Sequence, residues 1–171
     1  GYSLSRGRFV KWCAHDDLIS ENYLSACLAA LDQRPSASLA FGKTQCIDHN
    51  GEPIDWDAGS IMNSIDDPSP ARRLYTAIAY AGTCFPIFGV FRKDTLERTT
   101  LHRSYYGSDR ALIAEAALLG ECIEVPEATF FNREHPTRSI TSPISLSAAN
   151  GRMRAAGEPL RWSTSTSSPI F

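Results

Sequence analysis

Residues 9–35 constrain the fold more than any other part of this 171-residue chain. Residues 9–13 (Phe-Val-Lys-Trp-Cys) form a short apolar run of strand-forming residues, and they predict a β-strand. A helix is expected next, with Ser20 as its cap and Pro35 as its stop. A strand, a short turn and an amphipathic helix make up the basic unit of an α/β fold. The apolar residues of this helix follow i, i+3, i+4, i+7 spacing: Leu24, Cys27, Leu28 and Leu31.

Strands and helices continue to alternate after this unit. Asn50-Gly51 indicates a tight turn, so two strands follow each other through a hairpin. This predicts an α/β domain with a mixed sheet flanked by helices. We expect further strands over residues 39–47, 85–92, 122–125 and 128–132. Helices are expected over residues 72–81, with Leu74, Ile78 and Ala81 on one side, and over residues 109–119, with Ser108 as the cap. A long loop is expected over residues 56–70 and a helical turn over residues 94–99.

The domain is expected to occupy residues 1–140. After Ser139 the periodic pattern fades, and residues 141–171 are rich in Ser, Thr, Pro, Gly and Ala. Such a composition predicts a loosely structured tail.

Composition argues against several functional classes. A net charge of -2 gives no electrostatic reason to expect nucleic acid as a partner. The 5 cysteines are scattered without a CxxC pair, which argues against a zinc knuckle and favours reduced thiols in a cytoplasmic setting. No uninterrupted apolar run of about 18 residues is present, so no membrane span is expected.

Asp16 and Asp17 follow the first strand, at the position where α/β folds bind their ligands. Hard divalent cations prefer carboxylate oxygens, and magnesium or manganese takes one or two of them in addition to substrate phosphates. Adjacent acids at a turn are also common as solvated residues that complement the dipole of the next helix. From spacing alone, this simpler interpretation is favoured. His15 can contact a phosphate, add a metal ligand or only cap the turn.

Asp109 stands at the start of a helix, where a carboxylate can accept a proton from an attacking hydroxyl or complement the helix dipole. Taken alone, the dipole role is favoured. The segment 133–139 places several polar side chains after the last strand. There His135 can ligate a metal or contact a diphosphate, and Arg133 and Arg138 can neutralise charge on a leaving group, although an ordinary loop has the same composition.

Several segments, in their order along residues 6–139, resemble inverting family 2 glycosyltransferases of the GT-A fold, as found in several bacterial members. The first is RGRFVKW at residues 6–12, followed by AHDD at residues 14–17. The second is YYGSDRAL at residues 105–112, running on to EAALLG at 115–120. The third is VPE at residues 125–127, followed by FFNREHP at 130–136. The ordered combination is far more specific than any single segment.

The resemblance implies a transferase that moves a sugar, with inversion, from a nucleotide-sugar donor to a hydroxyl of a glycan or lipid-linked acceptor. Such enzymes serve polysaccharide or glycoconjugate synthesis. Asp16 and Asp17 match the acidic motif that binds a divalent cation, Mg²⁺ or Mn²⁺. Ala14 replaces the usual first Asp of that motif, which makes Asp16 the stronger candidate. Asp109 matches the catalytic base. We expect donor contacts from His15, Arg133, His135 and Arg138.

The catalytic domain of that family begins with βαβ units that hold the nucleotide base and ribose, and this sequence enters after them. The resemblance therefore implies the C-terminal portion of a GT-A domain, which by itself binds the donor weakly or not at all. The full-length protein is expected to be cytoplasmic, with a membrane-peripheral position as one option. Two alternatives stay open. One is a degenerate, non-catalytic transferase-like module, and the other is an HD-type metal phosphohydrolase, suggested by His15-Asp16, which requires a helical bundle.

Overall fold

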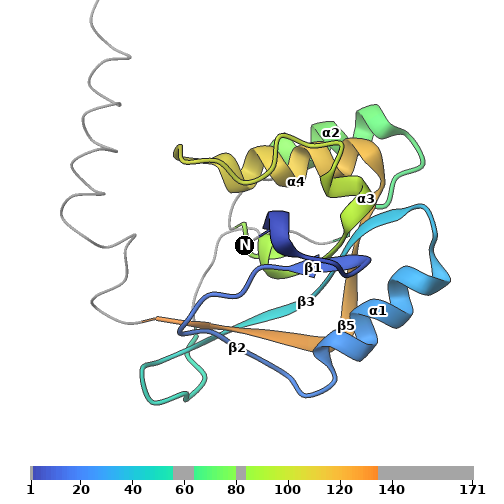
Figure 1. The fold of residues 1–171 in the computed structure, drawn as a ribbon. Helices are drawn as coiled ribbons and strands as arrows, with labels where there is room; N and C mark the ends of the chain where they lie inside the picture. The colour runs from blue at the N-terminus through green and yellow to red at the C-terminus, as the bar shows by residue number, and fades with distance from the viewer. Residues whose placement is uncertain (1, 56–63, 80–83, 135–171) are drawn as a thin grey trace, which may run out of the picture. The chain divides into compact units, whose positions relative to one another are not determined.

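The structure is a computed structural model and describes residues 2–55, 64–79 and 84–134. The expected tail over residues 141–171 lies outside these ranges, as does the first part of the expected loop over residues 56–70. Figure 1 shows the elements. In chain order they are η1 (Tyr2–Leu4), β1 (Phe9–Lys11), β2 (Leu18–Ile19), α1 (Tyr23–Gln33), β3 (Ala37–Ile47), α2 (Pro70–Ala79), η2 (Phe85–Phe88), β4 (Val90–Arg92), α3 (Lys93–Leu96), α4 (Ser108–Leu119) and β5 (Glu121–Arg133).

The strands form one mixed sheet in the order β1-β4-β3-β5-β2. β3 and β5 pair in parallel, whereas the other neighbouring strands pair antiparallel. The first six residues of β3 are all buried, as expected for a central strand that is covered on both faces. The predicted α/β fold with a mixed sheet is therefore confirmed.

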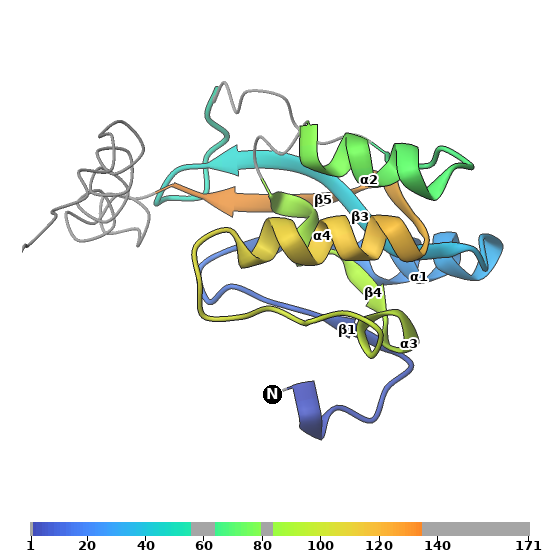
Figure 2. The same cartoon turned by 90° about the horizontal axis from the view of Figure 1, so that it is seen from above.

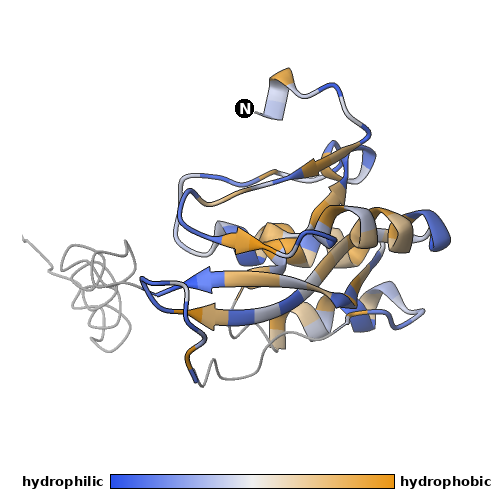
Figure 3. Ribbon diagram, turned by 90° about the horizontal axis from the view of Figure 1, so that it is seen from below, coloured by the Kyte–Doolittle hydropathy of each residue, from blue (hydrophilic) through white to orange (hydrophobic). Residues whose placement is uncertain are grey.

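Helices cover both faces of this sheet (Figure 1). On one face α1 packs Tyr23, Cys27 and Leu31 against the sheet. On the other face α2 and α4 lie side by side, and Leu112 of α4 contributes to a second apolar cluster. In Figure 3 apolar colour follows parts of the strands and of the neighbouring helices. No helix in the described ranges is long and apolar enough to cross a membrane.

Strand directions place several connections at one edge of the sheet. β1 is antiparallel to β4, and β4 is antiparallel to β3, so β1, β3 and β5 all point the same way. We call the edge where these three strands end the carboxyl edge. Residues 12–17 run along this edge from β1, at one side of the sheet, to β2 at the other. The amino end of α4 reaches the same edge (Figure 2).

The first helix differs from its prediction at the cap and on its buried face. It begins at Tyr23, and Ser20 lies before it, where the Ser20 hydroxyl donates to Asn22 Oδ1 at 2.7 Å and accepts from the Thr129 N–H at 3.0 Å. Leu24 is 47% exposed. Tyr23 takes the inner position because its hydroxyl accepts from the Gly42 N–H and so satisfies a buried polar group.

The residues that we expected on one side of the second helix do not form its buried face. Ile78 is 64% exposed, Ala81 lies outside the described residues, and Arg73 and Ala77 face inward instead. The physical reason is that α2 lies alongside α4, with Arg73 beside the C-terminal end of α4. There the Arg73 guanidinium donates to the Ala117 carbonyl at 2.7 Å, so a cation satisfies carbonyls at the helix C-terminus.

Two prolines explain differences in the strands. Residues 85–88 form the 3-10 helix η2 rather than part of a strand, because Pro86 has no N–H for a ladder and suits a helix start. Pro126 does not separate two strands. β5 is continuous, with a shift of register between Val125 and Thr129 that leaves Pro126 exposed. Before α4 the cap position belongs to Gly107, whose φ is 84°, and not to Ser108.

The predicted tight turn is present. The Asp48 N–H donates to the Glu52 carbonyl at 2.8 Å, and the Ile54 N–H donates to the Cys46 carbonyl at 3.0 Å. The chain thus reverses at the carboxyl end of β3, close to the end of β5.

Candidate functional site

Asp17 lies where β2 begins and has a defined structural contact. Its Oδ1 accepts the backbone N–H of Arg133 at 2.8 Å. β2 pairs with β5 through Leu18 and Phe131, so the carboxylate continues the ladder beyond the last paired residues. This contact satisfies an N–H at a strand end, which a shorter or apolar side chain could not do.

Arg133 joins the loops of the carboxyl edge. Its Nε donates to the Asp16 carbonyl at 2.9 Å, and its Nη1 donates to the carbonyls of Asp48 at 2.9 Å and His49 at 3.1 Å. We call this set of bonds the Arg133 clasp. The sequence predicted that the Arg133 guanidinium contacts the nucleotide-sugar donor. In the structure this guanidinium donates to main-chain carbonyls. The clasp fixes the backbone of Asp16 against the turn that follows β3.

Asp16 and His15 are neighbours of unequal exposure. The His15 side chain is 92% exposed, whereas that of Asp16 is 22% exposed, and His15 Nδ1 lies 3.5 Å from Asp16 Oδ1. The pair attracts electrostatically only when the imidazole is protonated. Asp16 therefore sits in a sheltered position on a backbone held by the Arg133 clasp, and His15 projects into solvent.

Lys11 was not singled out from the sequence. Its ammonium donates to the Trp12 carbonyl at 3.1 Å and lies 5.3 Å from the Tyr23 ring centroid and 5.9 Å from that of Phe130. Burial lowers its pKa, and the nearby Asp17 carboxylate partly opposes this change. The half-buried Lys11 ammonium thus lies beside the loop over residues 12–17, which carries Asp16 and Asp17 and which we call the acidic loop. A lysine within an apolar strand segment is the signal that could have pointed to it.

Asp109 lies in the first turn of α4 and reaches the carboxyl edge from the helical layer. Its neighbour is the Cys84 thiol, at the start of η2. Burial, with a smaller contribution from the Asp109 carboxylate, raises the pKa of the Cys84 thiol to about 12. The thiol therefore stays neutral at physiological pH and can donate to the carboxylate, which orients Asp109.

At this edge Asp16 and Asp17 offer two adjacent carboxylates, a number that suits magnesium or manganese only where a substrate supplies further ligands. Within residues 2–55, 64–79 and 84–134, no three or more His, Cys, Asp or Glu side chains are grouped to hold a metal ion. Asp16 and Asp17, in the loop over residues 12–17, can supply one or two carboxylate oxygens. Magnesium and manganese are commonly bound in this way, with phosphate oxygens and water completing the coordination.

The two candidate ligands and the candidate base lie on different elements, which both begin or turn at the carboxyl edge. Asp16 and Asp17 belong to the loop between β1 and β2, and Asp109 belongs to α4 (Figure 2). His135 and Arg138, the other expected donor contacts, lie outside the described residues. Searches for similar proteins found no protein-family model that matches this sequence and no curated protein that matches it.

Proposed function

We propose that this chain is part of an inverting, metal-assisted glycosyltransferase with a nucleotide-sugar donor and a hydroxyl acceptor, of the GT-A type. The observation that supports this most is the arrangement of the carboxyl edge. Two adjacent carboxylates lie on a loop held by the Arg133 clasp and a third lies at the start of α4, and both segments belong to the edge where α/β sheets bind their ligands. The transferase reaction requires carboxylates in these two separate roles.

In the proposed reaction Asp109 accepts the proton of the acceptor hydroxyl. The acceptor oxygen attacks the anomeric carbon of the donor, the bond from that carbon to the diphosphate oxygen breaks, and the configuration inverts. Asp16 and Asp17 would hold the divalent cation. When bound, this cation neutralises negative charge on the departing nucleoside diphosphate. The Arg133 clasp keeps the Asp16 backbone in place throughout.

One observation favours a second candidate, the non-catalytic module. Asp17 Oδ1 accepts a strand-end N–H, so part of the acidic pair serves the sheet itself. Under this alternative the acidic loop is a structural remnant, and Asp16 binds no metal. The HD-type phosphohydrolase has no such support, because the chain folds around a five-stranded sheet.

The proposal is tested by calorimetric titration of the full chain with MnCl₂ together with UDP, GDP, CDP or dTDP. We expect weak binding of at least one nucleoside diphosphate that requires manganese and is lost in Asp16→Ala. Asp32→Ala is the matched control, because Asp32 is an exposed acid of α1 on another part of the molecule. Binding should be unchanged in that variant.

Two results would contradict the proposal. The first is an absence of manganese-dependent binding of all four diphosphates at millimolar concentrations in the full-length protein as well as in this chain, which would favour the non-catalytic module. The second is binding that Asp16→Ala leaves intact, because the metal would then lie elsewhere. Circular dichroism of each variant, compared with the parent chain, confirms that the fold is retained.

A further inference from the structure

The loop over residues 97–107, which leads from α3 into α4, is held by its own hydrogen bonds. The Thr100 N–H donates to Glu115 Oε2 at 2.7 Å, and the Thr100 hydroxyl donates to Oε1 of the same carboxylate at 2.9 Å. Arg103 Nε donates to the Thr100 carbonyl at 2.9 Å. The buried Ser108 hydroxyl donates to the Arg103 carbonyl at 2.6 Å. Both ends of the loop are therefore fixed to α4.

This fixed loop presents two aromatic rings to solvent. Tyr105 is 51% exposed and Tyr106 is 80% exposed. Ordering a loop costs conformational entropy, and burial of large side chains commonly offsets that cost. Here polar contacts hold the backbone, and the largest side chains of the loop point outward. The Ser108 N–H donates to the Tyr105 carbonyl at 3.2 Å, and Gly107 turns the chain into α4 with a φ of 84°.

The two tyrosines are close to the candidate base along the chain. Asp109 follows Tyr106 by three residues, and the loop and the start of α4 share the carboxyl edge (Figure 2). A tyrosine has an apolar ring face and a polar hydroxyl at its tip. A saccharide ring has the matching pattern, with an apolar C–H face and hydroxyls around its rim. A rigid tyrosine also loses little side-chain entropy on binding.

The size of the surface argues for a sugar rather than a protein. Two tyrosine side chains offer at most roughly 300–500 Å². A stable protein partner requires about 800 Å² on each side. Two adjacent rings instead suit one or two sugar units.

We propose that Tyr105 and Tyr106 form the acceptor platform, on which a saccharide ring of a glycan acceptor stacks with its hydroxyl directed to Asp109. The assignment of an acceptor role rests on the proposed transferase function, whereas saccharide binding by the pair can be measured without it. The acceptor is thereby narrowed to a molecule that ends in a sugar.

The test is titration of the full chain with cellohexaose, maltohexaose and chitohexaose, followed by NMR. The Tyr105→Ala/Tyr106→Ala double variant should weaken binding of the recognised oligosaccharide about tenfold or more. Replacement of both residues by Phe should retain most of the affinity, because the ring faces remain. Tyr75→Ala is the matched control, since Tyr75 is 69% exposed but lies on α2. It should have no effect.

The inference is overturned if none of the three oligosaccharides binds, or if the double alanine variant binds as well as the parent chain. An equal loss in Tyr75→Ala would also overturn it, because the effect would then be general. The two proposals fail separately. Manganese-dependent diphosphate binding without saccharide binding would support the transferase function and contradict the acceptor platform. Saccharide binding through the tyrosines without diphosphate binding supports the platform and leaves a sugar-binding module.

Discussion

Two arginines gather main-chain carbonyls at opposite ends of the sheet, and their surroundings differ. Arg73 is 7% exposed, and its guanidinium donates to the carbonyls of Ala117 at 2.7 Å and Asp67 at 2.8 Å. Arg133 is half-buried and joins loops at the carboxyl edge. Arg73 closes the end of a helix, whereas Arg133 holds an acidic loop in place.

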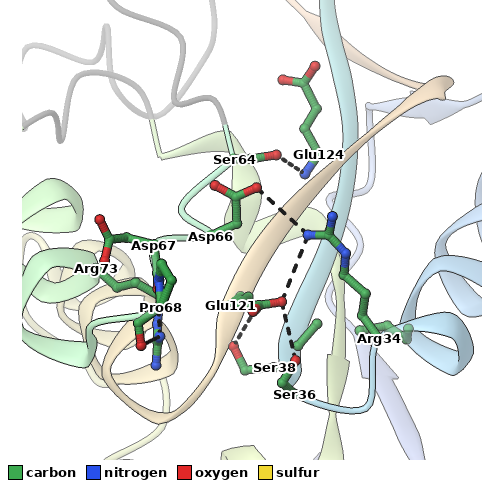
Figure 4. Close-up of polar contacts among 12 residues, drawn as sticks. Arg34, Ser36, Ser38, Ser64, Asp66, Asp67, Pro68, Arg73, Glu121 and Glu124 are labelled. Atoms are coloured by element: carbon green, nitrogen blue, oxygen red, sulfur yellow. Dashed lines mark hydrogen bonds and ion pairs between the residues drawn. The ribbon is translucent and has the colours of Figure 1, made fainter.

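The amino ends of β3 and β5 form the closed end (Figure 4). Arg34 lies 3.7 Å from Asp66 and 3.8 Å from Glu121, and the Ser38 hydroxyl donates to the Ala116 carbonyl at 2.9 Å. A Cβ atom on Gly120 would lie 2.5 Å from the Ser36 carbonyl oxygen, so this junction has no spare volume. These contacts tie α4, β3 and β5 together.

At the carboxyl edge, arginine bonds to main-chain carbonyls have a different consequence. There the clasped backbone leaves Asp16 partly accessible and His15 exposed, and the ordered loop before α4 exposes two tyrosines. The comparison teaches that side chains at the closed end pack against one another, whereas those at the carboxyl edge are held in place but stay accessible to solvent. Substitutions at the two edges should therefore separate into losses of stability and losses of binding or activity.

The largest effect is expected for Asp109→Asn in an active full-length enzyme. Loss of a general base lowers the rate of transfer by about 1,000-fold, because the amide cannot accept the proton. The fold should be retained, since the carboxylate is half-buried and the amide has a similar shape. The measurement is sugar transfer with each donor, together with thermal melting. Asp94→Asn, which alters an exposed first-turn acid of α3, is the control and should stay active.

Arg73→Met should cause the largest loss of stability, about 3 kcal/mol in urea denaturation, because it removes a buried cation that satisfies several carbonyls. Arg72→Met is the matched control. The Arg72 side chain is 78% exposed, and its guanidinium lies 3.7 Å from the Asp67 carboxylate, a long ion pair. It should cost less than about 0.5 kcal/mol. Similar losses in both variants would refute the closed-end interpretation.

Arg133→Ala should cost about 2 kcal/mol of stability, less than the change at Arg73, because the clasp is only half-buried. It should also weaken manganese-dependent diphosphate binding, because the Asp16 backbone is released. Arg133→Lys should recover little, since an ammonium cannot make the forked contacts of a guanidinium. Normal diphosphate binding in Arg133→Ala would show that the clasp does not position Asp16.

The last prediction concerns pH and again tests the closed end, and its effect is absent at neutral pH. Burial raises the pKa of the Cys122 thiol to about 12 from the ordinary value of 9.0 for a thiol. A raised folded pKa contributes stability that is complete below pH 9.0 and is lost as the pH rises toward about 12. One such thiol costs about 1.4 kcal/mol per pH unit in this window.

Urea denaturation between pH 8 and roughly pH 11 should therefore show a shallower decline for Cys122→Ala than for the parent chain. Cys13→Ala provides the control, because Cys13 is exposed at the other edge. A change of slope in Cys13→Ala, or none in Cys122→Ala, would contradict this prediction.

The sequence by itself was sufficient for the main elements and the class of fold. Apolar runs of β-formers and helical spacing predicted most strands and helices, and alternation predicted a mixed sheet. Asn50-Gly51 correctly predicted a chain reversal. These signals are local, because periodicity and turn chemistry act over a few residues. They also place Asp16 and Asp17 after a strand and Asp109 at a helix start.

Tertiary structure decided which side chains face inward and what the polar ones contact. Arg73 is buried because α2 lies alongside α4 and places this residue beside the C-terminal carbonyls of α4, whereas Ile78 is exposed. Helical spacing does not show which partner a helix meets. The same holds for Arg133, whose carbonyl partners come from two loops far away in the sequence. Local propensity determined the elements, but long-range hydrogen bonding and packing determined that three of them meet at the carboxyl edge.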